Sequence, residues 1–135
     1  MNINTLINKN TIWFIPGIAV ALGIFILSTF LALPTKMEGV SHLDKWEHTF
    51  AYLVLSFSFL FAFKKYEILD IKAAILIFLG SIGYGLLLEF IQYQFFQYRR
   101  FEWLDALANT FGVVLAFYIY FATNKKFFYT KKLSG

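Results

Sequence analysis

Three apolar stretches of the sequence each carry polar side chains at the spacing of one helical face. These side chains are Asp44, His48 and Tyr52 in the first stretch, Glu89 and Gln92 in the second, and Asp105 and Asn109 in the third. Residues three or four positions apart share one side of an α-helix. Carboxylates and imidazole transfer protons, and amides and phenols orient a bound ligand. The pattern therefore predicts a polar site built from three helices.

His48 and Glu89 are the candidates for moving protons. Histidine titrates near neutral pH, and a carboxyl group placed among apolar residues can act as a general acid or base. Asp44 and Asp105 would orient these two groups and complete a catalytic set. The alternative is structural, in which each charged side chain only satisfies a partner on a neighbouring helix. Buried ion pairs add little net stability compared with packed apolar side chains, which favours a functional role.

Lys45 and Arg99 are the candidates for holding an anion, because an arginine guanidinium can bind a phosphate through two parallel hydrogen bonds. Gln92, Asn109 and Tyr52 would line the same ligand-binding site. The alternative for the two cations is an interfacial role, in which they anchor the ends of membrane helices.

A metal ion is not expected from the sequence. The acidic residues and the histidine are ligand types for zinc or for harder ions. However, the chain has no H-E-x-x-H motif, and no spacing fixes a coordination geometry. The chain also has no cysteine, which excludes disulfides, thiolate metal sites and a cysteine nucleophile. We therefore expect no cofactor.

The composition places these residues in a membrane protein. Of 135 residues, 59% are hydrophobic and 15% are charged, with a mean hydropathy of +0.64. Soluble domains have about 45–50% apolar and about 25% charged residues, and so short a chain has no interior large enough to bury the excess. The net charge of +4 does not indicate nucleic-acid binding, because the basic residues lie between long apolar runs.

Four apolar runs are long enough to cross a bilayer, which takes about 20 helical residues. We predict an all-α fold, an integral membrane bundle of four transmembrane helices, forming a single domain over residues 1–135. The helices are expected at about residues 11–33, 42–63, 72–98 and 103–123. Eight of the 12 basic residues fall on the side that holds both termini. Since basic residues favour the cytoplasmic side, both termini are predicted to be cytoplasmic.

The polar residues lie at matched depths in the predicted bundle. His48, Glu89 and Asn109 are each 16 or 17 residues from a lysine at the cytoplasmic end of their helix, which is about 24–26 Å at 1.5 Å per residue. They should therefore meet near the outer boundary of the hydrocarbon. A charged group facing lipid would cost about 2.5–3.5 kcal/mol, so these groups should turn inward.

We expect the charged groups to pair where the helices approach closely. Small residues suited to close approach are Ser81 and Gly85 in the third helix, and Ala108 and Gly112 in the fourth. The predicted pairs are His48 with Asp44 or Glu89, and Arg99 with Asp105 or Glu102.

The same residues, taken in order, resemble a known family. The blocks are Asp44-Lys45-x-x-His48-x-x-Ala51-Tyr52, then Glu89-x-x-Gln92, then Arg99 followed by Trp103-Leu104-Asp105-x-x-Ala108-Asn109-x-x-Gly112. With the four-helix layout, they resemble the VanZ family of small bacterial membrane proteins, named after an accessory glycopeptide-resistance protein that lowers teicoplanin susceptibility. The family's arginine commonly follows a Pro or Gly turn, which this chain lacks, but the spacing to Trp103 favours Arg99 over Arg100. The resemblance implies a VanZ-like multi-pass protein of the bacterial inner membrane, and no particular reaction.

Three functions fit these features. A polar site at the outer-leaflet side would bind or modify a membrane lipid, a lipid-linked envelope precursor or another amphiphile, as an enzyme or as a binding protein. The family's link to glycopeptides is compatible with this. Alternatively, a non-catalytic structural or accessory protein would use its polar network only to fix helix packing. Transport is disfavoured, because the inner halves of the helices are almost purely apolar; a homo-oligomer is left open.

Overall fold

The computed structural model describes residues 11–30, 41–96 and 100–124, with the side chains of 41–43 excepted. Regular structure in this part of the chain is entirely helical. It consists of a short 3-10 helix, η1 (Thr11–Phe14), and the helices α2 (Ile15–Thr29), α3 (Ser41–Lys65), α4 (Ile71–Phe95) and α5 (Trp103–Thr123). Each of the four long helices, the first counted together with η1, is long and apolar enough to cross a membrane. The predicted all-α fold with four candidate membrane spans is confirmed.

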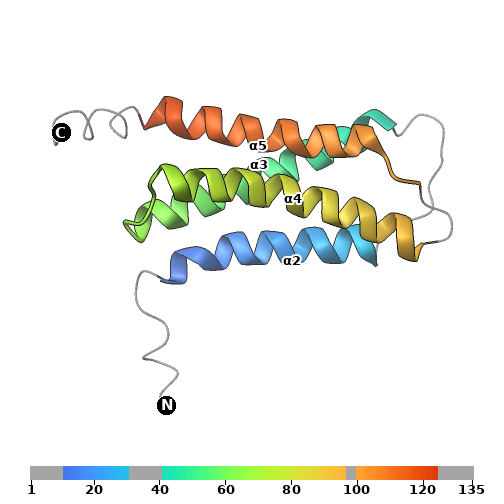
Figure 1. Ribbon diagram of the computed structural model, residues 1–135, viewed down its shortest axis with the longest axis horizontal. Coiled ribbons are helices and arrows are strands. Elements are labelled where there is room, and N and C mark those ends of the chain that lie inside the picture. The colour runs from blue at the N-terminus through green and yellow to red at the C-terminus, as the bar shows by residue number, and fades with distance from the viewer. Residues whose placement is uncertain (1–10, 31–40, 97–99, 125–135) are drawn as a thin grey trace, which may run out of the picture.

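Successive helices run in opposite directions, so the four pack side by side as an up-and-down bundle (Figure 1). α3 and α5 share the most extensive contact, α4 also packs on α5, and α2 covers α3 and α4. Residues 66–70 alone connect α3 to α4, and so short a link makes its two helices antiparallel neighbours. The predicted cytoplasmic placement of both termini stays a prediction.

Local sequence sets the turn between α3 and α4. Asp70 is the N-cap of α4, and its Oδ1 accepts a hydrogen bond of 2.7 Å from the backbone N–H of Ala73. Such a cap satisfies one of the N–H groups left unpaired at a helix start. Glu67 adopts a left-handed φ of 62°, and its N–H donates to the carbonyl of Lys64. These two residues end one helix and begin the next.

Two apolar clusters follow one another along the interior of the bundle. The first contains Tyr52, Leu55 and Val113, and the second contains Leu60, Ile77 and Tyr120. Because most of these side chains come from α3 and α5, the core lies mainly between those two helices. It fixes their relative rotation, and this rotation determines which side chains meet beyond the core.

α2 joins the bundle through a small residue and a hydrogen bond. Gly17 lies against the ring of Phe59 in α3, where a Cβ would come within 3.2 Å of the ring carbons. The hydroxyl of Tyr84 in α4 donates to the carbonyl oxygen of Ala21 at 2.6 Å. These contacts attach α2 to the α3–α5 core from one side.

The outward faces of all four helices are apolar. Large exposed side chains include Leu22 and Leu27 in α2, Trp46 and Phe50 in α3, Leu76 and Leu79 in α4, and Leu107 and Tyr118 in α5. Soluble monomers rarely expose continuous apolar surface of this extent. The surface suits contact with lipid, while the acidic side chains described below gather between the helices.

Candidate functional site

Lys45, near the start of α3, brings together carboxylates from two helices. Its Nζ lies 3.1 Å from Oε2 of Glu102 and 3.5 Å from Oδ2 of Asp44, and it also donates to Oδ1 of Asp105. Glu102 is the N-cap of α5 and Asp105 is in its first turn, where the helix dipole favours negative charge. One ammonium group thus ties the beginning of α3 to the beginning of α5.

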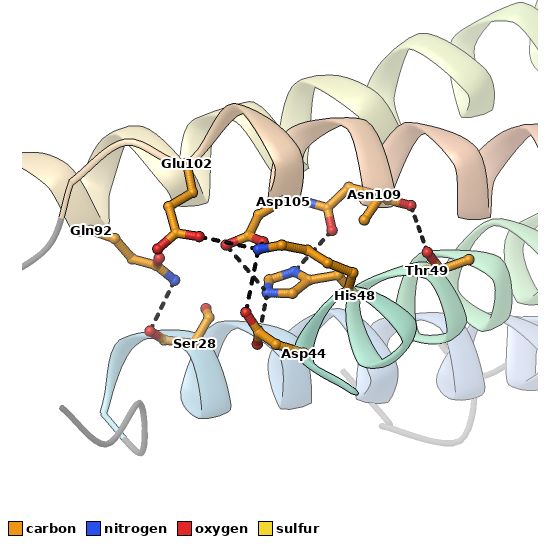
Figure 2. Close-up of polar contacts among 10 residues, drawn as sticks. Ser28, Asp44, His48, Thr49, Gln92, Glu102, Asp105 and Asn109 are labelled. Carbon is orange, nitrogen blue, oxygen red and sulfur yellow. Dashed lines mark hydrogen bonds and ion pairs between the residues drawn. The ribbon is translucent and has the colours of Figure 1, made fainter. Parts of the chain in front are cut away.

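His48, one helical turn after Asp44, has both ring nitrogens directed at oxygen atoms. Its Nδ1 donates to Oδ1 of Asn109 at 3.0 Å, as Figure 2 shows. Its Nε2 lies 3.6 Å from Oδ1 of Asp44 and 3.8 Å from Oδ2 of Asp105. These two distances exceed that of a hydrogen bond. Asn109 therefore orients the ring, and the second nitrogen faces two carboxylates.

Asp44 and Asp105 each use their two carboxylate oxygens for two different partners, Lys45 and His48. In each carboxylate, one oxygen pairs with Lys45 and the other faces Nε2 of His48. The Asp105 side chain is only 10% exposed, whereas that of Asp44 is 46% exposed. The group therefore runs from the interior of the bundle to its surface, and an external molecule can reach it from the Asp44 side.

Close contact between α3 and α5 makes this meeting of side chains possible. A Cβ at Gly112 would overlap the backbone carbonyl oxygen of Thr49, so only glycine fits there. Thr49 itself donates through Oγ1 to the carbonyl of Ala108 at 3.2 Å (Figure 2). Small residues allow such close backbone approach between membrane helices, and the predicted role of Gly112 is confirmed.

Glu89 brings a further carboxyl group from α4. It is buried, with 3% of its surface exposed. It accepts a hydrogen bond from the backbone N–H of Glu102 and interacts electrostatically with Asp105 and His48. The three helices predicted to contribute to the polar site therefore all do so.

Gly85, one turn before Glu89 in α4, leaves room for two of the predicted site residues. A Cβ there would lie 3.0 Å from Nδ2 of Asn109 and 3.2 Å from the Tyr52 ring. Tyr52 is almost fully buried and belongs to the apolar core one turn beyond His48. Its ring therefore lies at the boundary between the polar group and the apolar core.

Gln92 reaches α2 from the polar end of the bundle. Its Nε2 donates to the carbonyl oxygen of Ser28 at 3.0 Å, and Figure 2 shows it on the far side of Glu102 from His48. A membrane helix end requires such polar partners for its last carbonyl groups. The structure thus gives Gln92 a contact that attaches α2, in addition to its predicted place at the site.

Two of the predicted contacts are confirmed. His48 and Asn109, placed at equal depth from the sequence, form a hydrogen bond. His48 also faces Asp44, one of its two predicted partners. Arg99 lies outside the described residues, so its predicted pairing is not tested. Lys45, predicted to hold an external anion, is paired with the protein's own carboxylates.

Two residues of the site were not singled out for it from the sequence. The sequence predicts Glu102 only as a partner for Arg99 and assigns no role to Thr49. A signal existed for Glu102, because it precedes Asp105 by three positions and so shares its helical face. For Thr49 there was none, since its role depends on how closely the two backbones approach.

Comparison with protein-family models, with curated proteins and with solved structures finds no match to this chain. The resemblance to the VanZ family therefore stays a prediction from the motif residues. The best evidence for function is the geometry of the polar site.

Proposed function

We propose that this chain is a multi-pass membrane protein that binds the polar head group of an envelope lipid or another amphiphile at one end of its helix bundle. The observation that carries the proposal is the set of side chains around Lys45 and His48. It is half-buried between apolar helices and open at Asp44 and Glu102, whose side chains are 46% and 56% exposed.

The surroundings of this opening suit an amphiphile better than a water-soluble ligand. Trp46 follows Lys45 in α3, and Leu104 precedes Asp105 in α5; both are more than 60% exposed. An acyl or isoprenoid chain would contact these apolar side chains in the bilayer, and the attached head group would reach the carboxylates. A soluble ligand would gain nothing from the apolar part of this surface.

The charges restrict the chemistry of the head group. The site contains four carboxyl groups, which belong to Asp44, Glu89, Glu102 and Asp105. Lys45 is the lysine that lies among them. Because that ammonium already contacts three of the carboxylates, it does not offer a phosphate an unopposed positive charge. The direct complement is a positive group, carried by the head group or bound together with it.

The sequence pattern supports an envelope location for this ligand. The predicted orientation puts the polar end of the bundle at the outer leaflet of a bacterial inner membrane. Lipid-linked envelope precursors are used on that face, and the glycopeptides to which the VanZ family is linked act there. The VanZ-like resemblance is the reason for proposing an envelope lipid in particular, with a link to glycopeptide resistance.

A second candidate function is structural, as an accessory protein whose polar network only fixes helix packing. One observation favours it: Lys45 pairs with Asp105, and His48 pairs with Asn109, without any external group. The two functions differ in what happens when an exposed carboxylate of the site is neutralised. If the site binds a head group, neutralising the carboxylate removes a bound lipid. If the network is only structural, no ligand is lost.

The test is mass spectrometry of lipids that co-purify with the full chain in mild detergent. Asp44→Asn and Glu102→Gln neutralise the two most exposed carboxylates of the site, and Glu89→Gln neutralises the most deeply buried one. Glu47→Gln is the matched control, because Glu47 is an exposed carboxylate of α3 outside the polar group. We expect a lipid species enriched in the wild type and in the control and depleted in the three site variants.

Unfolding in the same detergent separates the two functions. The head-group proposal requires that Asp44→Asn and Glu102→Gln lose the lipid while the chains stay folded and still unfold cooperatively. If all variants retain the same lipids as the wild type, and the site variants lose only stability, the polar group is structural and the proposal is wrong.

A further inference from the structure

One ligand atom from each of three residues, Asp44, His48 and Asp105, lies close to those of the other two. The facing atoms are Oδ1 of Asp44, Nε2 of His48 and Oδ2 of Asp105, at 3.6 and 3.8 Å from the nitrogen to the two oxygens. One ligand atom from each residue lies within 4.8 Å of the others. The group combines an imidazole nitrogen with carboxylate oxygens from two helices, and these are ligand types for first-row divalent ions.

The separations distinguish an ion from a hydrogen bond. A direct N–H···O bond would bring nitrogen and oxygen to about 2.7–3.2 Å. Two ligands held at about 2.0–2.2 Å from one ion, in tetrahedral or trigonal geometry, are about 3.3–3.8 Å apart. The observed distances from Nε2 to the two oxygens are too long for a direct hydrogen bond. They are within a few tenths of an ångström of the separation expected for two ligands of one ion.

The orientation of His48 is a second, independent feature. Its Nδ1 lies 3.0 Å from Oδ1 of Asn109. An amide oxygen can only accept a hydrogen bond, so Nδ1 carries the proton. In the neutral ring, Nε2 then directs a lone pair at two carboxylates, an arrangement that is repulsive without a cation between them. Histidines that ligate metals usually donate their other N–H to a carbonyl or carboxylate, which fixes the ring in this way.

Lys45 leaves the aspartate oxygens that face His48 available to an ion. It pairs with Oδ2 of Asp44 and Oδ1 of Asp105, the oxygens that do not face His48. The three carboxylates that contact Lys45 leave a net charge of −2, so a divalent cation would bring the total to 0. An imidazolium at His48 would leave −1, so the ion balances the charge better than protonation of His48 does.

We propose that Asp44, His48 and Asp105 bind a divalent transition-metal ion of the Zn²⁺ type, oriented by Asn109. Three protein ligands leave a fourth position open. Asp44 is the most exposed of the three ligands, so an anionic head group could reach the ion from that side. This role for the ion rests on the proposed head-group site, but binding of the ion itself does not.

The test uses the full chain, purified in detergent and treated with EDTA. Binding of Zn²⁺ alone is measured by calorimetry, and Co²⁺ is added separately, because a tetrahedral Co²⁺ site gives intense visible absorption. The variants are His48→Gln and Asp105→Asn, with Glu47→Gln as the control on the same helix. Mg²⁺ is the control ion, since it prefers octahedral oxygen ligands and gains little from imidazole.

We expect one Zn²⁺ per chain and a visible Co²⁺ spectrum for the wild type and for Glu47→Gln. His48→Gln and Asp105→Asn should each weaken Zn²⁺ binding at least tenfold. A wild-type chain that shows neither Zn²⁺ binding nor the Co²⁺ absorption overturns the proposal, even if a variant fails to fold. Unchanged Zn²⁺ affinity in a folded His48→Gln chain overturns it equally.

The outcome can be separated from that of the head-group proposal. Zn²⁺ binding with no change of co-purified lipid in Asp44→Asn supports the metal site and contradicts head-group binding. A lipid that is lost in Asp44→Asn, from a wild-type chain that binds no Zn²⁺, supports head-group binding and contradicts the metal site.

Discussion

Gly112 of α5 lies directly against the backbone carbonyl of Thr49 in α3, with no room for a Cβ between them. This contact lies between the polar group at the beginning of α5 and the apolar core beyond it. It determines how close the two helices come, and so whether Asn109, one turn before Gly112, can reach His48. The polar site therefore depends on a residue that has no side chain.

Gly112→Ala should destabilise the folded chain, because the new methyl group overlaps a carbonyl oxygen that cannot move without its helix. Overpacking of this kind costs about 1–3 kcal/mol. Thermal unfolding in detergent measures it, with Gly83→Ala as the control, since a Cβ at Gly83 meets no atom within 4 Å. Equal melting temperatures for Gly112→Ala and the wild type would show that α3 and α5 are not this close.

His48 and Asn109 should be energetically coupled. Hydrogen bonds between membrane helices average about 0.6 kcal/mol in double-mutant cycles, with a maximum of about 1.7 kcal/mol. A cycle of His48→Ala, Asn109→Ala and the double variant, followed by thermal unfolding, measures this coupling. Single-variant effects that add within about 0.3 kcal/mol would mean that the two side chains do not interact.

Lys45→Met should destabilise the chain by about 1–3 kcal/mol, between the values for exposed and buried ion pairs. The reason is that three carboxylates lose their common cation while staying close together. Adding Asp105→Asn to Lys45→Met should restore part of the loss, because it removes the most buried of those charges. Lys72→Met, at an exposed lysine of α4, is the control for a lost charge alone. No rescue by the double substitution would argue against the pairing with Asp105.

Tyr84→Phe should loosen α2 while leaving the rest of the bundle intact. It removes the hydroxyl that donates to the carbonyl of Ala21 at 2.6 Å, a loss of about 0.5–1.5 kcal/mol. Hydrogen exchange followed by mass spectrometry should show faster exchange in α2 and an unchanged rate in α5. Tyr93→Phe, at an exposed tyrosine of α4, should leave both rates as they are; faster exchange throughout the chain would contradict a local role.

The metal site shows where inference from sequence stops. Asp44 and His48 are four positions apart, so helical geometry alone places them on one face. Asp105 is 57 residues beyond His48, and no periodicity reports how α5 is rotated against α3. No ligand motif links the three residues, which is why a metal was not expected from the sequence.

The pairing of Lys45 has the same origin. Its position near the beginning of a helix is visible in the sequence, and the predicted role of holding an external anion or anchoring the helix follows from that position. The structure places Glu102 and Asp105 of α5 within its reach. Only the packing of two helices decides whether such a cation serves the protein or a ligand.

The sequence by itself determined the four apolar helices, the level of the polar residues along each helix and the face on which each lies, because hydropathy and the 3.6-residue period are properties of a single segment. It also identified the small residues that permit close approach. The tertiary structure decided which polar atoms meet: Nδ1 of His48 with Asn109, and one oxygen of each aspartate with Lys45. Those choices depend on rotation and separation between helices, which are fixed by side-chain packing across the α3–α5 interface and by the absence of a side chain at Gly112.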